Sequence, residues 1–425
     1  MDVATIKLWG KQVGAVLWDA ERQLASFEYT PEFVSLGLEI APIKMPLRAN
    51  TIYNFSELSR NATFKGMPGL LADVIPDKYG NALINAWLVA NDRPADSMNP
   101  VETLCFIGLR GMGALEFEPS TGGASARATK IEIDGLVDIA GKILRNRQDF
   151  SADITSDEQK ALLDILRIGT SAGGARAKAL IAYNDTTGEV RSGQAKAPAG
   201  FQHWLIKFDG VHDTQFGATY GFGRVEQAYH LMAKDCGIEM SECKLLEENG
   251  RAHFMTRRFD RTPEKLHVQS WGALEHIDFN DVGLYSYEQL FQTMRALGLS
   301  YPQAEQMFRR MVFNVIARNC DDHAKNFAFT MNQSGEWALS PAYDICHAYR
   351  PGSIWVSKQS LSVNGKRENI TQTDLEQVAK QMNIKGSRDI IKQVQEKVND
   401  WESYARSVNV NMEIAKGIGK TLLRL

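Results

Sequence analysis

The chain has 425 residues, which is too long for one ordinary hydrophobic core and predicts two or three domains. Its net charge of −3 argues against the large basic field of a protein that binds nucleic acid directly. No apolar run approaches the roughly 20 residues that span a bilayer, and the first residues lack the apolar core of a signal peptide.

The cysteines are scattered, odd in number and not spaced as zinc-binding pairs: Cys105, Cys236, Cys243, Cys320 and Cys346. They provide no disulfide framework, which fits a reducing compartment. We therefore expect a cytoplasmic protein that makes no contact with a membrane.

Residues 1–125 are predicted to form an N-terminal subdomain that begins with short strands. Alternating apolar residues place these strands at Ile6–Trp9, Gln12–Trp18 and Gln23–Tyr29, with a hairpin turn between the first two. A helix is expected over Asn81–Asn91.

Two glycine-rich stretches follow this helix. Phe106–Ala114 could be a structural turn or a phosphate loop, and the turn is favoured because no Walker-type lysine and helix follow it. The small and polar stretch Pro119–Thr129 is the best candidate for a linker between domains.

Residues 126–260 are predicted to form a small lobe rich in β-structure. Helices are expected over 136–145, 156–167 and 225–236, and strands over 179–183, 204–208 and 253–259. Residues 261–425 are mostly helical in pattern, over 287–297, 303–318, 373–382 and 389–407, with an Asn-Gly hairpin signal at 362–366. A β-rich lobe followed by a helical lobe is the order of a protein-kinase fold, and the predicted class is α+β.

The segment 319–329, Asn-Cys-Asp-Asp-His-Ala-Lys-Asn-Phe-Ala-Phe, carries the strongest functional signal. Asp321 and Asn326 lie five positions apart, as in the kinase catalytic loop, where the aspartate receives the proton of the substrate hydroxyl and the asparagine holds a metal ion. Asp344 follows Asn326 by 18 positions, in the order of the kinase aspartate that binds Mg²⁺. The alternative is that the aspartates cap or solvate a loop.

Two further residues of this segment have open interpretations. His323 is either a packed, hydrogen-bonded loop residue or a metal ligand beside the aspartates. Lys325 either neutralises the transferring phosphate or is a solvated lysine.

The predicted small lobe contains candidates for the phosphate-binding parts. The small residues of the stretch 169–178, Gly-Thr-Ser-Ala-Gly-Gly-Ala-Arg-Ala-Lys, let backbone N–H groups approach phosphate oxygens, although an ordinary turn is the alternative. Lys207 lies inside a hydrophobic strand, where a kinase places the lysine that binds the nucleotide phosphates. Glu226, at the start of the next helix, is its expected ion-pair partner, or simply a glutamate that favours the helix dipole.

Together these residues resemble the HipA family, bacterial serine/threonine kinases that act as toxins of toxin–antitoxin pairs. The resemblance covers nearly the whole chain. It rests on residues 64–73 and 75–77 in the N-terminal part, and on residues 171–178, 205–208, 258–261, 319–326 and 339–344 in the kinase part.

The resemblance implies ATP and Mg²⁺ as cofactors and assigns roles to residues of this chain. Asp321 looks like the proton acceptor, and Asn326 and Asp344 match the metal-binding positions. The positions implied to bind the nucleotide are Gly173, Gly174, Ala175, Arg176, Ala177, Lys178, Lys207, Arg257, Arg258, Phe259, His323, Lys325, Asn326, Tyr343 and Asp344. Ser171 aligns with a serine that family members autophosphorylate to switch themselves off.

The chain departs from the best-known family type at three positions. Arg257 replaces an acidic linker residue, Asp322 replaces a glycine, and Ala177 precedes Lys178. None of these changes removes a core catalytic part.

The resemblance also implies partners: a HipB-like helix-turn-helix antitoxin, a protein substrate in translation such as an aminoacyl-tRNA synthetase, and operator DNA reached mainly through the antitoxin. Two alternatives remain open. The chain could be a kinase-fold co-repressor subunit without its own phosphotransfer role, or a metal-dependent hydrolase whose ligands are Asp321, Asp322, His323 and Asp344.

Overall fold

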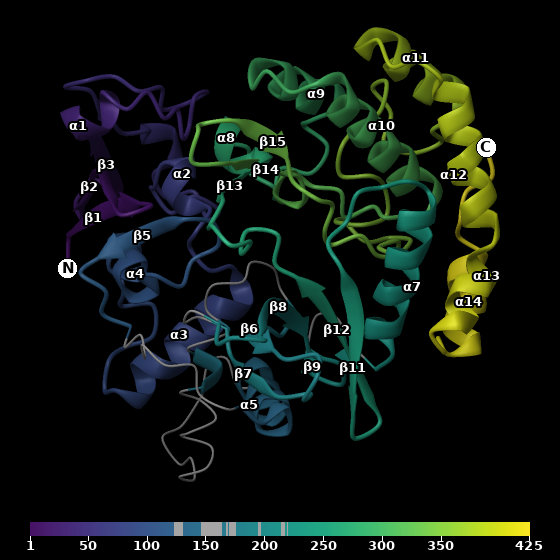
Figure 1. Cartoon of the computed structure of the whole chain (residues 1–425), viewed down its shortest axis with the longest axis horizontal. Coiled ribbons are helices and arrows are strands. Elements are labelled where there is room, and N and C mark those ends of the chain that lie inside the picture. The colour runs from purple at the N-terminus through teal and green to yellow at the C-terminus, as the bar shows by residue number, and fades with distance from the viewer. Residues whose placement is uncertain are drawn as a thin grey trace.

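The computed structural model describes residues 1–122, 131–145, 164–166, 169, 176–193, 197–213, 217–218 and 220–425. Figure 1 shows an N-terminal subdomain beside a β-rich small lobe, and a helical region that forms the C-terminal side of the molecule. The predicted α+β class with a kinase-like arrangement is confirmed. Among the described residues, no helix has the length and apolar character needed to cross a membrane.

The N-terminal subdomain is built on a five-stranded antiparallel sheet in the order β4-β3-β2-β1-β5. Its strands are β1 (Val3–Leu8), β2 (Lys11–Asp19), β3 (Leu24–Tyr29), β4 (Ile52–Tyr53) and β5 (Leu115–Glu118). The first three confirm the predicted strands, and the chain turns between β1 and β2 at Trp9-Gly10, both with positive φ. Short helices complete the core of this subdomain: α1 (Pro31–Val34) and α4 (Pro100–Ile107) pack on the sheet, and η1 (Ser56–Leu58) and α2 (Gly69–Ala72) contribute to the same apolar cluster.

Helix α3 (Lys78–Ala90) leaves this subdomain and packs on the small lobe. Its buried Tyr79, Leu83 and Ala86 belong to the same apolar cluster as helix α5 (Ile133–Arg145) and the small-lobe sheet. In Figure 1, α3 lies beside β6 and α5. The N-terminal part of the sequence therefore supplies part of the small-lobe core.

The small-lobe sheet has the order β11-β12-β8-β6-β7 and is antiparallel throughout. Its strands are β6 (Lys178–Tyr183), β7 (Val190–Ser192), β8 (Gln202–Lys207), β11 (Cys243–Glu248) and β12 (Arg251–Arg257), beside a two-stranded ribbon of β9 (His212–Asp213) and β10 (Gly217–Ala218). Because side chains alternate along a strand, Trp204 and Ile206 enter the core while Lys207 projects from the opposite face.

Helix α7 (Phe222–Asp235), which follows this sheet, packs into the core of the large lobe. That core is formed mainly by helices α8 (Trp271–Glu275), α9 (Tyr287–Ala296), α10 (Tyr301–Ile316), α11 (Gln372–Met382), α12 (Ser387–Asn399), α13 (Trp401–Ser407) and α14 (Met412–Gly419). A three-stranded sheet of β13 (His267–Ser270), β14 (Ala328–Met331) and β15 (Trp337–Leu339) lies beside α8.

Some predicted elements differ from the structure. The single helix expected over 389–407 is wrong, because Asp400 ends α12 and α13 starts one residue later. The Asn-Gly signal forms a turn, with positive φ at Asn364 and Gly365, but it is closed by an isolated bridge rather than a hairpin. Of the helix expected over 156–167, only residues 164–166 are described, and these are helical.

Candidate active site

The loop that carries Asp321 follows α10, and its first two residues are fixed by main-chain hydrogen bonds. The amide of Asn319 donates to the carbonyl of Asn314 at 2.9 Å, and the amide of Cys320 donates to Ala348 at 3.0 Å. Beyond Asp321, the short helix η2 (Ala324–Asn326) leads into β14. The predicted catalytic segment is thus a rigid connection between the longest helix of the large lobe and a buried strand.

Asp322 anchors this loop from the inside. Its buried carboxylate accepts hydrogen bonds from the Tyr287 hydroxyl at 2.7 Å, the Gln359 amide at 2.9 Å and the main-chain N–H of Ser360 at 2.7 Å. Burial raises the pKa of this carboxyl to about 6, although the hydrogen bonds oppose the shift. Both oxygens are used by protein donors, so Asp322 does not suit the ligand role that the hydrolase alternative requires.

Asp321 points the other way and its side chain is 51% exposed. The side-chain amide of Asn326 donates to the main-chain carbonyl of Asp321 at 2.7 Å, which closes the loop and leaves the amide oxygen as the atom a hard metal ion would take. Although half of the side chain is exposed, the surrounding protein partly desolvates the carboxyl, and this partial desolvation together with the nearby charge of Asp344 raises the pKa of Asp321, which suits a proton acceptor.

His323 is held as a loop residue. Its Nδ1 accepts the main-chain N–H of Lys325 at 3.3 Å and caps η2, and its ring lies 5.2 Å from that of Phe279. Its Nε2 lies 3.8 Å from the Asp321 carboxylate. These contacts support the packed-loop interpretation of His323.

Lys207 joins the small lobe to the large lobe through two carboxylates. Its ammonium lies 2.5 Å from Glu226 on α7 and also pairs directly with Asp344. The expected Lys207–Glu226 ion pair is therefore confirmed. Asp344 has a left-handed backbone with φ 51°, which an aspartate tolerates better than most residues and which directs its carboxylate toward Lys207.

This three-residue cluster has strongly coupled charges. Burial alone would lower the pKa of Lys207, but Asp344 and Glu226 outweigh it and raise the pKa. Burial likewise would raise the pKa of Asp344, but Lys207 and Lys178 hold it well below its usual range. Lys207 is thus a cation, and Asp344 a carboxylate, across the physiological pH range.

The predicted phosphate loop is only partly described. Ser171, Gly173, Gly174 and Ala175 lie outside the described residues. The end of the loop is described: the Ala177 carbonyl accepts the N–H of Phe208 at 3.0 Å, and Lys178 lies opposite Lys207 in the β6–β8 register. Arg176 lies over the ring of Phe222 at 4.9 Å, and its charge reaches Asp321.

Residues 257–261, the linker that connects the small lobe to the large lobe, are held by a buried charge cluster that the sequence did not reveal. Asp260 is fully buried and accepts hydrogen bonds from Arg258 at 2.6 and 2.9 Å and from Arg261 at 2.8 Å. Arg261 also donates to the carbonyls of Gly111 and Gly113 at 2.8 and 2.7 Å. The glycine-rich stretch of the N-terminal subdomain is therefore a structural turn, as predicted.

The other predicted linker residues differ in exposure. Arg257 is 48% exposed and lies 3.6 Å from Glu242, whereas the ring of Phe259 stacks on Tyr343 with 6.0 Å between centroids. The Tyr343 hydroxyl donates to the carbonyl of Lys325 at 2.7 Å. Phe259 and Tyr343 thus connect the linker to the catalytic loop, and a nucleotide role for these residues remains a prediction.

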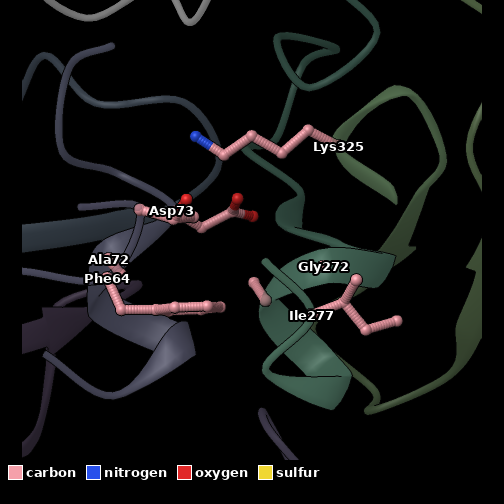
Figure 2. A pocket seen from close by; sticks show the side chains of 8 residues that line it. Phe64, Ala72, Asp73, Gly272, Ile277 and Lys325 are labelled. Carbon is pink, nitrogen blue, oxygen red and sulfur yellow. The ribbon is translucent and has the colours of Figure 1, made fainter. Parts of the chain in front are cut away.

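The ammonium of Lys325 is directed to the N-terminal subdomain rather than to solvent. It lies 2.7 Å from Asp77, and both side chains are mostly buried. In Figure 2, Lys325 extends above Asp73 at a pocket between α2 and α8. Sequence reasoning missed Asp73 and Asp77 as site residues; Asp77 lies in a Pro-Asp turn within the family-like stretch, but its partner is 248 positions away.

The arrangement gathers the parts that phosphoryl transfer needs. Lys207 can bind anionic oxygens, Asp321 can accept a proton, and the oxygens of Asn326 and Asp344 are the hard donors that Mg²⁺ prefers. Within the described part of the chain, no group of three His, Cys, Asp or Glu side chains is arranged to hold a metal by itself. A donor set of two side chains suits Mg²⁺, which keeps waters and bridges to phosphates.

Comparisons with protein families cover most of the chain. Residues 4–118 match the HipA N-terminal domain, and residues 170–401 match the HipA-like C-terminal domain. The putative kinase Y4dM of Sinorhizobium fredii (strain NBRC 101917 / NGR234) is 25% identical over 217 residues, which is 45% of this chain and 49% of the relative. The match thus spans about half the length of that curated relative.

Two solved structures are similar. HipA of the Shewanella oneidensis MR-1 toxin–antitoxin system, solved with HipB and its operator DNA, aligns with a TM-score of 0.67 and 16% identity over 98% of this chain and 94% of that chain. The Helicobacter pylori proinflammatory kinase CtkA gives a TM-score of 0.34 and 12% identity over 59% of this chain and 92% of its own. The first similarity establishes a shared fold.

Proposed function

This chain belongs to the HipA family, and from that premise we propose that it is a Mg²⁺- and ATP-dependent serine/threonine protein kinase that acts as the toxin of a toxin–antitoxin pair. The observation that carries the proposal is the cluster of Lys207, Glu226 and Asp344. A buried lysine held by a helix glutamate, beside a second carboxylate at the catalytic loop, is the arrangement by which kinases bind nucleotide phosphates.

Each side chain has a distinct task in the proposed reaction. Lys207 binds and orients the nucleotide phosphates, with Glu226 keeping its ammonium in place. Asn326 and Asp344 would hold Mg²⁺, which supplies charge neutralisation of the phosphates when bound. Asp321 accepts the proton of the attacking serine or threonine hydroxyl, and its exposed side chain is accessible to a protein substrate.

The proposal extends to regulation and partners. Ser171 is proposed as an autophosphorylation site: a phosphate dianion among phosphate-binding amides is incompatible with bound ATP phosphates. The proposed substrate is a translation protein of the aminoacyl-tRNA synthetase type. A HipB-like helix-turn-helix antitoxin is the proposed protein partner, with operator DNA bound mainly through it; the Shewanella oneidensis HipA–HipB–operator complex supports this assignment.

The test is incubation of the purified protein with Mg²⁺ and ATP, followed by intact mass and phosphopeptide mapping. We expect a gain of one phosphate on Ser171 that is absent in Asp321→Asn. ATP binding without any phosphate transfer, either to itself or to a synthetase substrate, would contradict the kinase proposal. That outcome would favour the co-repressor alternative, in which the fold only holds an antitoxin on its operator.

A further inference from the structure

The catalytic loop is tied to the N-terminal subdomain by the ion pair between Lys325 and Asp77. The Lys325 ammonium lies 2.7 Å from the Asp77 carboxylate, with the two side chains 17% and 19% exposed. The ammonium also lies 5.2 Å from the centre of the Phe279 ring. Because the pair is mostly shielded from water, its attraction is screened far less than that of a surface pair.

Asp77 lies where it can connect the catalytic loop with the predicted phosphate loop. It precedes the first residue of α3, and α3 then contributes Tyr79 and Leu83 to the core of the small lobe. These two residues lie against Gly169, at the start of the glycine-rich stretch, where an added Cβ would come within 2.6 Å of Leu83. One short helix therefore contacts one end of the predicted phosphate loop and, through Asp77, the catalytic loop.

The Asp77 carboxylate compensates the positive charges of nearby lysines. Lys65, Lys178 and Lys325 all lie within range of its electrostatic field. Lys65 itself donates to Asn81 on α3 at 3.1 Å, and Lys178 is the first residue of β6. Without the Asp77 charge, the repulsion between Lys65 and Lys325 would be less compensated. Lys325 would keep the charges of Asp73 and Asp278 but would lose its 2.7 Å partner.

We propose that Asp77 is a positioning residue for phosphoryl transfer. Its carboxylate holds Lys325 and thereby keeps the catalytic loop, residues 319–326, in a fixed position relative to the predicted phosphate loop, residues 169–178. This inference rests on the proposed kinase function. Asp77 acts on the catalytic loop through its ion pair with Lys325. A small displacement of a catalytic group is enough to slow a reaction by about 100-fold.

The test compares Asp77→Asn and Asp77→Glu with the wild type in single-turnover phosphate transfer at saturating Mg²⁺ and ATP. Nucleotide affinity and thermal unfolding are measured on the same samples. We expect Asp77→Asn to slow transfer by about 10- to 100-fold while the Kd for ATP changes less than about twofold. Asp77→Glu retains the charge and should keep more of the transfer rate.

Two further variants isolate the mechanism. Glu116→Gln is the matched control, because Glu116 pairs with Lys265 at 2.7 Å between the same two parts of the chain but away from the catalytic loop. It should transfer phosphate at the wild-type rate. Lys325→Met should transfer phosphate as slowly as the double variant Asp77→Asn/Lys325→Met. Either substitution alone already breaks the Asp77–Lys325 ion pair, so the second substitution has nothing further to remove.

The outcomes separate the two proposals. A wild-type protein that transfers no phosphate would overturn the kinase function, and the positioning role with it. An active wild type with an equally active Asp77→Asn variant would overturn the positioning role alone. So would multiplicative losses in the double variant, or a slower rate that merely follows a loss of folded protein.

Discussion

The side-chain amide of Asn326 donates a hydrogen bond to the main-chain carbonyl of Asp321 at 2.7 Å. The two residues that the sequence pairs by spacing are therefore in direct contact, and the contact fixes the path of the loop between them. The carboxylate of Asp321, the proposed proton acceptor, takes no part in this bond and can face a substrate. The hydrogen bond to the main-chain carbonyl thus fixes the loop and leaves the Asp321 side chain free of that bond.

The adjacent aspartates should separate catalysis from stability. Asp321→Asn is expected to abolish phosphate transfer with little change in unfolding free energy, because this side chain is 51% exposed. Asp322→Ala should instead destabilise the protein by about 3 kcal/mol or more, because three buried donors lose their acceptor. Urea unfolding and transfer assays on both variants check this pair; a stable Asp322→Ala protein would contradict the anchoring role.

Lys207→Met should impair the nucleotide site without disturbing the catalytic loop. The substitution removes the direct ion-pair partner of Glu226, which is 3% exposed, and removes the charge that would bind phosphates. We expect transfer to fall by about 100- to 1,000-fold and ATP affinity to weaken. Calorimetry with ATP measures the affinity, and Lys244→Met serves as a control, because Lys244 lies on the edge strand β11 and pairs with Asp185. Unchanged ATP affinity in Lys207→Met would argue against its phosphate role.

Asn326→Ala should raise the Mg²⁺ requirement of the reaction. Loss of the amide oxygen removes one of two proposed side-chain ligands, and loss of the amide N–H frees the Asp321 carbonyl. The Mg²⁺ concentration for half-maximal transfer should increase at least about 10-fold. A Mg²⁺ titration at fixed ATP provides the measurement, with His323→Ala as the comparison. If the Mg²⁺ concentration for half-maximal transfer rises equally in both variants, Asn326 is not a metal ligand.

Asp260 should make stability sensitive to acid. Burial would raise the pKa of this carboxyl, but Arg258 and Arg261 outweigh it and hold the pKa well below the unfolded value of about 3.9. A depressed folded-state pKa stabilises the protein above pH of about 4, and this contribution is lost as the pH falls below that value. Asp260→Asn should cost about 3–5 kcal/mol at pH 7, because two buried arginines lose their carboxylate.

The acid prediction has a direct control. The gap in unfolding free energy between wild type and Asp260→Asn should be constant from pH 5 to pH 7 and narrow only below pH of about 4. The exposed Asp281→Asn variant should show no such gap at any pH. A gap that widens toward low pH would have the wrong sign for a carboxyl with a lowered pKa.

Local sequence predicted those parts of the site that lie on one short segment. The Asp321–Asn326 spacing and the lysine inside strand β8 are both local signals, because strand alternation and loop length set them. The Lys207–Glu226 pair was also accessible, since the glutamate lies at the start of the next long helix.

The contacts that join distant segments could not be predicted in this way. Asp77 and Lys325 are 248 positions apart, and Asp260 meets Gly113 across 147 positions. Periodicity reports which face of an element is apolar, not which other element covers it. The break at Asp400 was missed for a related reason: α12 and α13 both present apolar residues to the same core, so the pattern continues across the turn.

The passage of α3 into the small-lobe core has a consequence for how the chain can be divided. Tyr79, Leu83 and Ala86 are covered by residues of α5 and the small-lobe sheet, and α7 is covered by the helices of the large lobe. A fragment cut at the end of the N-terminal sheet would therefore expose apolar surface on both pieces. The smallest fragment that can keep its catalytic half intact has to start upstream of α3, so gene truncation is a poor way to obtain an autonomous enzyme.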